Sequence, residues 1–190
     1  RRVLFRSTIS AGTLVVGSAA PSGSAGALGN ASSAVLLGDT SGSANAALVT
    51  NGAFAVARNI TVQAGSSGTA TIGGSTAHSS CFTGNVVLNK NVILTAVSGG
   101  TATFSTGVIS GSYALTKTDV GTVVLSGTNT YTGVTTISAG TLVVGSAAPS
   151  GAAGALGNAS SAVLLGDTSG SANARSEEHT SELQSHLNLV

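Results

Sequence analysis

The chain has 190 residues, of which 7% are charged and 3% aromatic, and its formal net charge is +1. So little charge offers no basic surface for nucleic acid, and we therefore expect no nucleic-acid partner. The one cysteine, Cys81, cannot form an internal disulfide, and no apolar run reaches the ~18 to 20 residues that a membrane-spanning helix needs.

Short apolar or alternating stretches alternate with breaks rich in Gly, Asn and Ser, and no segment has a helical period. The equivalent stretches around Pro21 and Pro149 are expected to be loops. The pattern predicts strands at Thr13–Val16, Ala34–Leu37, Ala53–Val56, Ile60–Gln63, Thr69–Ile72, Val86–Leu88, Val92–Ala96, Thr101–Phe104, Thr122–Ser126, Thr135–Ser138, Thr141–Val144 and Ala162–Leu165. Such strands without helices leave a sandwich, a barrel or a solenoid.

An internal duplication selects the solenoid. Residues Thr8 to Ala46 reappear as Thr136 to Ala174 with one change, Ser24 against Ala152. Near-identical segments of this kind stack on copies of themselves, so the partners of each coil are its neighbours in the same chain. With three short strands and their turns, a coil takes roughly 20 to 25 residues, and the repeat period holds about five or six coils. Apolar residues such as Leu125, Ile137, Leu142 and Val144 would fill the interior, with Thr and Ser outside and Gly and Asn at the corners.

The two ends differ in composition from everything between them. Residues 175–181, read as AGA TCG GAA GAG CAC ACG TCT, give on the opposite strand AGA CGT GTG CTC TTC CGA TCT, which translates to residues 1–7. We therefore interpret residues 1–7 and 175–190 as translated sequencing-adapter sequence and residues 8–174 as the repeat segment. This interpretation predicts that the two ends make no specific contacts. Within 8–174 the formal charges cancel, since Arg58, Lys90 and Lys117 balance Asp39, Asp119 and Asp167.

One stretch carries a more specific pattern. Residues 121–145 read GTVVLSGTNTYTGVTTISAGTLVVG and follow Leu115-Thr116-Lys117. This order resembles the autotransporter-associated β-strand repeat, also called the passenger-associated transport repeat, and Thr8 to Gly17 resembles the tail of a preceding copy. The resemblance implies an all-β, right-handed parallel β-helix in the passenger of a bacterial autotransporter. It also implies secretion or display at the outer membrane, with a translocator β-barrel outside this fragment.

Groups suited to catalysis are few and scattered. Asp39 and Asp167 occupy the same Leu-Leu-Gly-Asp-Thr context in the two copies, which favours a turn role, and Asp119 is also expected in a turn. His78 and Cys81 form an isolated H-x-x-C that lacks further metal ligands in the sequence. Tyr131 suits corner packing better than sugar stacking. We therefore predict no catalytic residue, no metal site and no cofactor.

Three functional classes follow. The first is a non-enzymatic structural or adhesive passenger stalk, with carbohydrate or other surfaces as its ligands. The second is a threonine-array, ice-binding-like surface, which requires the Thr-x-Thr sequences at residues 69–71, 101–103, 116–118 and 128–130 to line up on one face. The third is a non-catalytic fragment of a carbohydrate-active β-helix protein, whose acids would lie elsewhere in the protein.

Overall fold

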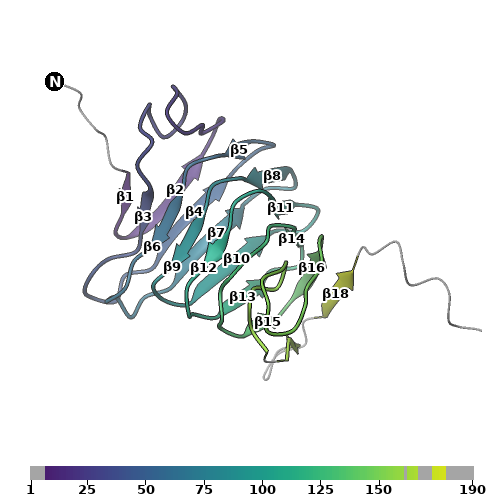
Figure 1. The fold of residues 1–190 in the computed structure, drawn as a ribbon. Coiled ribbons are helices and arrows are strands. Elements are labelled where there is room, and N and C mark those ends of the chain that lie inside the picture. Colours follow the sequence, from purple (N-terminus) through teal and green to yellow (C-terminus); the bar gives the residue numbers. More distant parts are fainter. Residues whose placement is uncertain (1–6, 161, 167–172, 179–190) are drawn as a thin grey trace, which may run out of the picture.

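The structure is a computed structural model that describes residues 7–160, 162–166 and 173–178. Its regular elements are strands joined by turns and loops, and the chain winds through them in successive coils (Figure 1). In the described part of the chain, no helix has the length and apolar character required to cross a membrane.

Strands of successive coils pair in parallel and form three sheets. Sheet A contains β1 (Thr8–Ile9), β3 (Val35–Leu37), β6 (Ile60–Val62), β9 (Val86–Leu88) and β12 (Ile109–Ser110). Sheet B contains β2 (Gly12–Val16), β4 (Ala46–Thr50), β7 (Ala70–Gly74), β10 (Val92–Ala96), β13 (Leu115–Thr118), β15 (Thr135–Ile137) and β17 (Leu164–Leu165). Sheet C contains β5 (Ala55–Val56), β8 (Ser79–Phe82), β11 (Thr101–Phe104), β14 (Thr122–Leu125), β16 (Gly140–Val144) and β18 (Ala174–Glu178). The predicted parallel β-solenoid is therefore confirmed.

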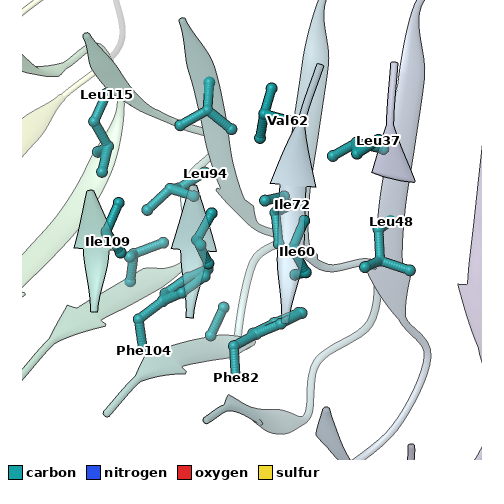
Figure 2. Packing of buried hydrophobic residues seen from close by; sticks show 14 of the residues in the cluster. Leu37, Leu48, Ile60, Val62, Ile72, Phe82, Leu94, Phe104, Ile109 and Leu115 are labelled. Atoms are coloured by element: carbon teal, nitrogen blue, oxygen red, sulfur yellow. The ribbon is translucent and has the colours of Figure 1, made fainter. Parts of the chain in front are cut away.

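Side chains of stacked strands form columns inside the coil. In sheet C, Phe82 lies beside Phe104, and the two rings stack with centroids 4.9 Å apart. In sheet A, Ile60 lies beside Val86, and both side chains are buried. Figure 2 shows Phe82, Phe104 and Ile60 among the apolar side chains between the sheets. Leu125, Ile137, Leu142 and Val144 are at most 3% exposed, so their predicted place in the core is confirmed. Burial of such columns in each coil supplies most of the stabilisation.

Asparagine side chains close several corners by binding the backbone of the next coil. The Asn85 N–H donates to Asn59 Oδ1 (2.9 Å), and the Val108 N–H donates to Asn85 Oδ1 (2.9 Å). At another corner the Ala114 N–H donates to Asn91 Oδ1 (3.0 Å), across a sequence separation of 23 residues. The expected coil size and the expected asparagines at corners are thus present. A neutral amide bonds its neighbours without the repulsion that stacked charges would cause.

Every strand predicted from the sequence has a counterpart, but six strands were not predicted. These are β1, β4, β8, β12, β13 and β18. The alternation fails to reveal β13 because Lys117 occupies an inward position, and it fails to reveal β8 because Ser80 does so. In both strands the polar residue is less than 4% exposed, which the sequence pattern alone would not indicate.

The two copies of the duplicated segment lie in different sheets. In the first copy, Thr8–Ile9 and Gly12–Val16 belong to sheets A and B. The equivalent Thr136–Ile137 and Gly140–Val144 belong to sheets B and C. The repeat period therefore spans five coils plus one further side of the coil.

The prediction that the two ends make no specific contacts is wrong for their described residues. Leu36 N–H donates to the carbonyl of Ser7 (2.8 Å), and Arg175 to Glu178 pair with Thr141 to Val144 in parallel. The physical reason is that an edge strand presents unpaired peptide groups, which an extended chain of any sequence can satisfy. Residues 1–6 and 179–190 lie outside the described residues.

Candidate functional site

The groups considered for catalysis lie at separate places on the solenoid. Asp39 follows β3, and its Oδ1 accepts a hydrogen bond from the N–H of the next residue (2.7 Å), as in a turn. His78 Nδ1 lies 3.1 Å from Thr76 Oγ1. Cys81 Sγ, on the outside of sheet C, lies 3.3 Å from Ser105 Oγ. Asp167 lies outside the described residues. Within the described ranges, no three His, Cys, Asp or Glu side chains gather as a metal-binding group.

Arg58 is fully buried and holds the long loop that follows β2. Its Nη1 donates to the carbonyl of Leu28 (2.9 Å), and its Nε donates to the carbonyl of Ser33 (3.1 Å). Burial lowers the pKa of Arg58. The planar guanidinium thus ties two backbone carbonyls of the loop to the second coil.

Lys117 is fully buried although its column in sheet B is otherwise apolar, between Leu94 and Ile137. Its Nζ donates to the carbonyls of Asp119 (2.6 Å) and Ala139 (3.2 Å), and also to that of Thr118. Desolvation lowers the pKa of Lys117 to about 8, and the charge of Asp119 opposes this decrease. Lys117 therefore closes the corner between sheets B and C from inside.

Asp119 shapes the same corner through its backbone. Its φ of 59° makes it the one non-glycine residue with positive φ in the described chain. Its Oδ2 accepts a hydrogen bond from Thr95 Oγ1 of the preceding coil. Gly140 passes so close that a Cβ there would lie 2.3 Å from the carbonyl oxygen of Asp119. The predicted turn role of Asp119 is therefore confirmed.

Asn129 and Tyr131 build a second corner, beside sheet A. Asn129 is buried, accepts the Ile109 N–H (2.9 Å) and donates to the carbonyl of Ala155 (2.8 Å). Tyr131 is also fully buried, with its hydroxyl 2.7 Å from Thr135 Oγ1. Burial raises the pKa of Tyr131 to about 12. Tyr131 packs a corner, as predicted, and its ring is not available to a ligand.

A cleft of about 410 Å³ opens on the outside where sheet A passes into sheet B. Its lining includes Ser66, Gly68, Lys90, Asn91, Tyr113 and Thr116. Lys90 Nζ donates to the carbonyl of Ser66 (2.8 Å) and to that of Gly68. Tyr113 is 40% exposed at the edge of the cleft. The sequence analysis did not identify this cleft, because Lys90 and Tyr113 become neighbours only through the register of the coils.

The four Thr-x-Thr sequences do not share one face. Residues 69–71 lead into sheet B, and residues 116–118 lie in it. Residues 101–103 lie in sheet C. Residues 128–130 lie beside sheet A, where the Thr130 N–H donates to the carbonyl of Ile109 (2.9 Å). The flat array that an ice-binding surface requires is therefore absent from these four sites.

Comparison with known proteins finds a family match for the stretch that contains both buried corners. Neither a curated protein nor a solved structure matches the chain. The model of the family described as passenger-associated-transport-repeat matches residues 115–144. This range begins with β13, ends with β16, and includes Lys117, Asn129 and Tyr131. Residues 115–144 are therefore a passenger-associated transport repeat, as the sequence resemblance predicted.

Proposed function

We propose that the chain is part of the shaft of an autotransporter passenger, with a structural rather than enzymatic role. The observation that carries the proposal is the use of the repeat's distinctive side chains. Lys117 and Asn129 are buried and donate to carbonyls of the next coil, and Tyr131 is buried with its hydroxyl bonded to Thr135, so their chemistry serves packing and stacking. Side chains that pack the corners and bond one coil to the next allow further coils to be added to the stack.

The placement of the other charged groups supports the same proposal. Arg58 and Lys90 donate to backbone carbonyls of adjacent coils. Asp39 follows sheet A, whereas Asp119 lies between sheets B and C, so the two acids occupy different corners. A glycosidase or lyase requires acids or an acid and a base on opposite sides of one bond. Asp39 and Asp119 therefore do not form such a pair.

The proposal includes surface or secreted localisation and an adhesive contribution. A passenger repeat is consistent with export, and the outward faces carry Ser, Thr and Asn that can bond to polar surfaces. Weak contacts repeated along a shaft gain strength because the first contact raises the effective concentration of the next. The chain therefore holds or presents the parts attached to it at a distance from the cell.

The proposal can be tested by inserting the chain between a signal peptide and a translocator barrel in a Gram-negative host. We expect the chain to reach the outside of intact cells, where added protease or antibody detects it. A Tyr131→Ala variant should reduce display, because it empties a fully buried corner. Retention of the wild-type chain inside the cell would contradict the proposed role. Turnover of a polysaccharide that disappears in Asp119→Ala would contradict the non-enzymatic part.

A further inference from the structure

We propose that the cleft between sheets A and B binds a saccharide that carries a carboxylate. The Tyr113 ring would contact the sugar face, and the Lys90 ammonium would contact the carboxylate. This inference rests on the proposed function as an exported surface stalk, because such a stalk meets glycans of other cells or matrices. It adds one defined site to a shaft whose other contacts are diffuse.

The register of the coils brings the two key residues together. Val92 lies beside Leu115, and the Ala114 N–H binds Asn91 Oδ1, so one residue earlier Lys90 lies beside Tyr113. Neighbouring strands in a sheet are about 4.8 Å apart. An ammonium and an aromatic ring thus flank one place on the surface, although they are far apart in the sequence.

A glycine lies in the lining of the cleft. Ile93 lies beside Thr71, which places Gly68 next to Lys90 in the preceding coil. A Cβ on Gly68 would lie 2.0 Å from the carbonyl oxygen of Ala44, so close packing of the coils excludes a side chain there. The column therefore passes from a glycine to a long cation and then to an aromatic ring.

The charge of the cleft favours an acidic ligand over a neutral one. Lys90 supplies one positive charge, and no Asp or Glu is among the lining residues. An ammonium has three donors. Two of them bind the carbonyls of Ser66 and Gly68, which fix the ammonium at the cleft. The third can donate to a carboxylate, and such charge-assisted bonds are stronger than neutral ones.

The remaining lining suits a polyhydroxylated ligand. Tyr113 is 40% exposed and presents an apolar ring with a polar tip. Asn91 uses its Oδ1 for the neighbouring coil, and its Nδ2 amide group is a further donor type suited to a sugar hydroxyl. Thr69 and Thr116 add hydroxyl groups to the lining. An aromatic platform with a few polar groups around it is the usual composition of a small-molecule site.

The test is titration of the full chain with trigalacturonate, with maltotriose as the neutral comparison, followed by calorimetry or ligand-observed NMR. We expect trigalacturonate to bind with a Kd in the millimolar range and maltotriose to bind at least about fivefold more weakly. Tyr113→Ala should weaken trigalacturonate binding about tenfold or more. Lys90→Gln should remove the difference between the two sugars. Added salt should weaken the wild-type interaction, because the ammonium faces solvent.

Val87→Ala is the matched control. Val87 is 40% exposed, like Tyr113, but Val87 lies in sheet A. This variant should bind as the wild type does. The proposal is overturned if trigalacturonate fails to bind at several millimolar, if Tyr113→Ala binds normally, or if both sugars bind the wild type equally. The unfolding midpoint of each variant shows whether it is folded. If trigalacturonate does not bind, the chain should still be displayed on intact cells. Failure of this inference is therefore distinguishable from failure of the proposed function.

Discussion

Leu14 and Leu142 are the same residue of the duplicated sequence, yet they lie in different sheets. Leu14 pairs with Leu48 in sheet B, whereas Leu142 lies between Val123 and Ser176 in sheet C. Both strands alternate in the same way, and a parallel sheet asks only that alternate residues face the interior. Each side of the coil can therefore accept the same segment.

The loop that follows each of these strands keeps its own geometry in both places. In the first copy the Ala27 N–H donates to the carbonyl of Ala19 (2.9 Å), and in the second copy Ala155 N–H donates to Ala147 (2.9 Å). The groups that hold the loop differ, since Arg58 binds the first copy and Asn129 the second. The duplicated sequence thus encodes a local shape, and the coils around it decide which side of the solenoid it occupies.

Cysteine pairs should verify this change of side. In a Cys81→Ser background, Thr122→Cys and Thr141→Cys should form a disulfide, because the two residues are neighbours in sheet C. Their Cα atoms lie about 4.8 Å apart in a parallel sheet, within the usual disulfide range of about 4.4–6.8 Å. Mass spectrometry after mild oxidation measures the bridge.

The control pair is Thr116→Cys with Thr141→Cys, which belong to sheets B and C. This pair should remain reduced under the same conditions. A bridge in the control pair, together with none between positions 122 and 141, would place the second copy on the side that the first copy occupies.

Lys117 should make stability depend on pH in an unusual direction. The folded chain releases the Lys117 proton near pH 8, whereas the unfolded chain keeps it up to about 10.5. Between these values the unfolded state binds more protons, so the free energy of unfolding rises with pH. One pKa unit corresponds to about 1.4 kcal/mol, so the difference of about 2.5 units limits the rise to about 3.5 kcal/mol. Urea unfolding between pH 7 and 10 measures it.

Lys117→Met should remove this rise, because no group titrates at that position. At pH 7 we expect the variant to lose about 1 to 3 kcal/mol, since the carbonyls of Asp119 and Ala139 lose a buried donor. Lys90→Met is the matched control and should retain the pH dependence of the wild type. If stability instead falls between pH 8 and 10 in the wild type alone, the ammonium is stabilised by folding.

Much of this fold follows from the sequence, but the relations between coils do not. Alternation predicted strands such as Val92–Ala96, and the positions of Leu125 and Leu142 in the core follow from the same pattern. The side of the coil on which a strand lies depends on the summed length of all preceding turns, and these lengths vary. The proximity of Lys90 and Tyr113 depends on that sum, so the cleft could not be predicted from either residue.

The polar interior shows the same limit. Lys117 is an expected member of the family pattern, but hydropathy places a lysine on the surface. Its burial becomes understandable only when the carbonyls of the corner are known, because they replace the water that the ammonium loses. Sequence reasoning therefore located the motif and missed the direction in which its cation points.

Tyr131 should contribute to stability through its hydroxyl as well as its ring. Tyr131→Phe removes the buried bond to Thr135 Oγ1 (2.7 Å) and should cost about 1 to 2 kcal/mol. Tyr113→Phe, on the exposed residue, should change stability by less than about 0.5 kcal/mol. The pKa of Tyr131 is raised to about 12, so the unfolded state loses its proton first and stability should fall above pH 10. Equal losses in the two variants would show that the Tyr131 hydroxyl has no special partner.

The last strand offers a test of where the repeat sequence ends. In the first copy, Ala46 is followed by Ala47, Leu48, Val49 and Thr50, and Leu48 is fully buried. In the second copy, Ala174 is followed by residues 175–178, and the residue beside the buried Leu142 is Ser176, which is exposed. The apolar column therefore stops at a serine.

Replacing residues 175–178 by Ala-Leu-Val-Thr should restore the column and raise the free energy of unfolding by about 1 to 2 kcal/mol. Full burial of a leucine contributes about 1.5–3 kcal/mol, and β18 is an edge strand of sheet C among the described residues. The control replacement Ala-Ser-Val-Thr keeps Ser176 and should have little effect, because it restores the neighbours without the leucine. Thermal unfolding compares the two. A similar increase in both variants would mean that charge at positions 175, 177 and 178, rather than the missing leucine, limits the strand. No increase in either would show that a leucine at position 176 is not buried against Leu142 of β16.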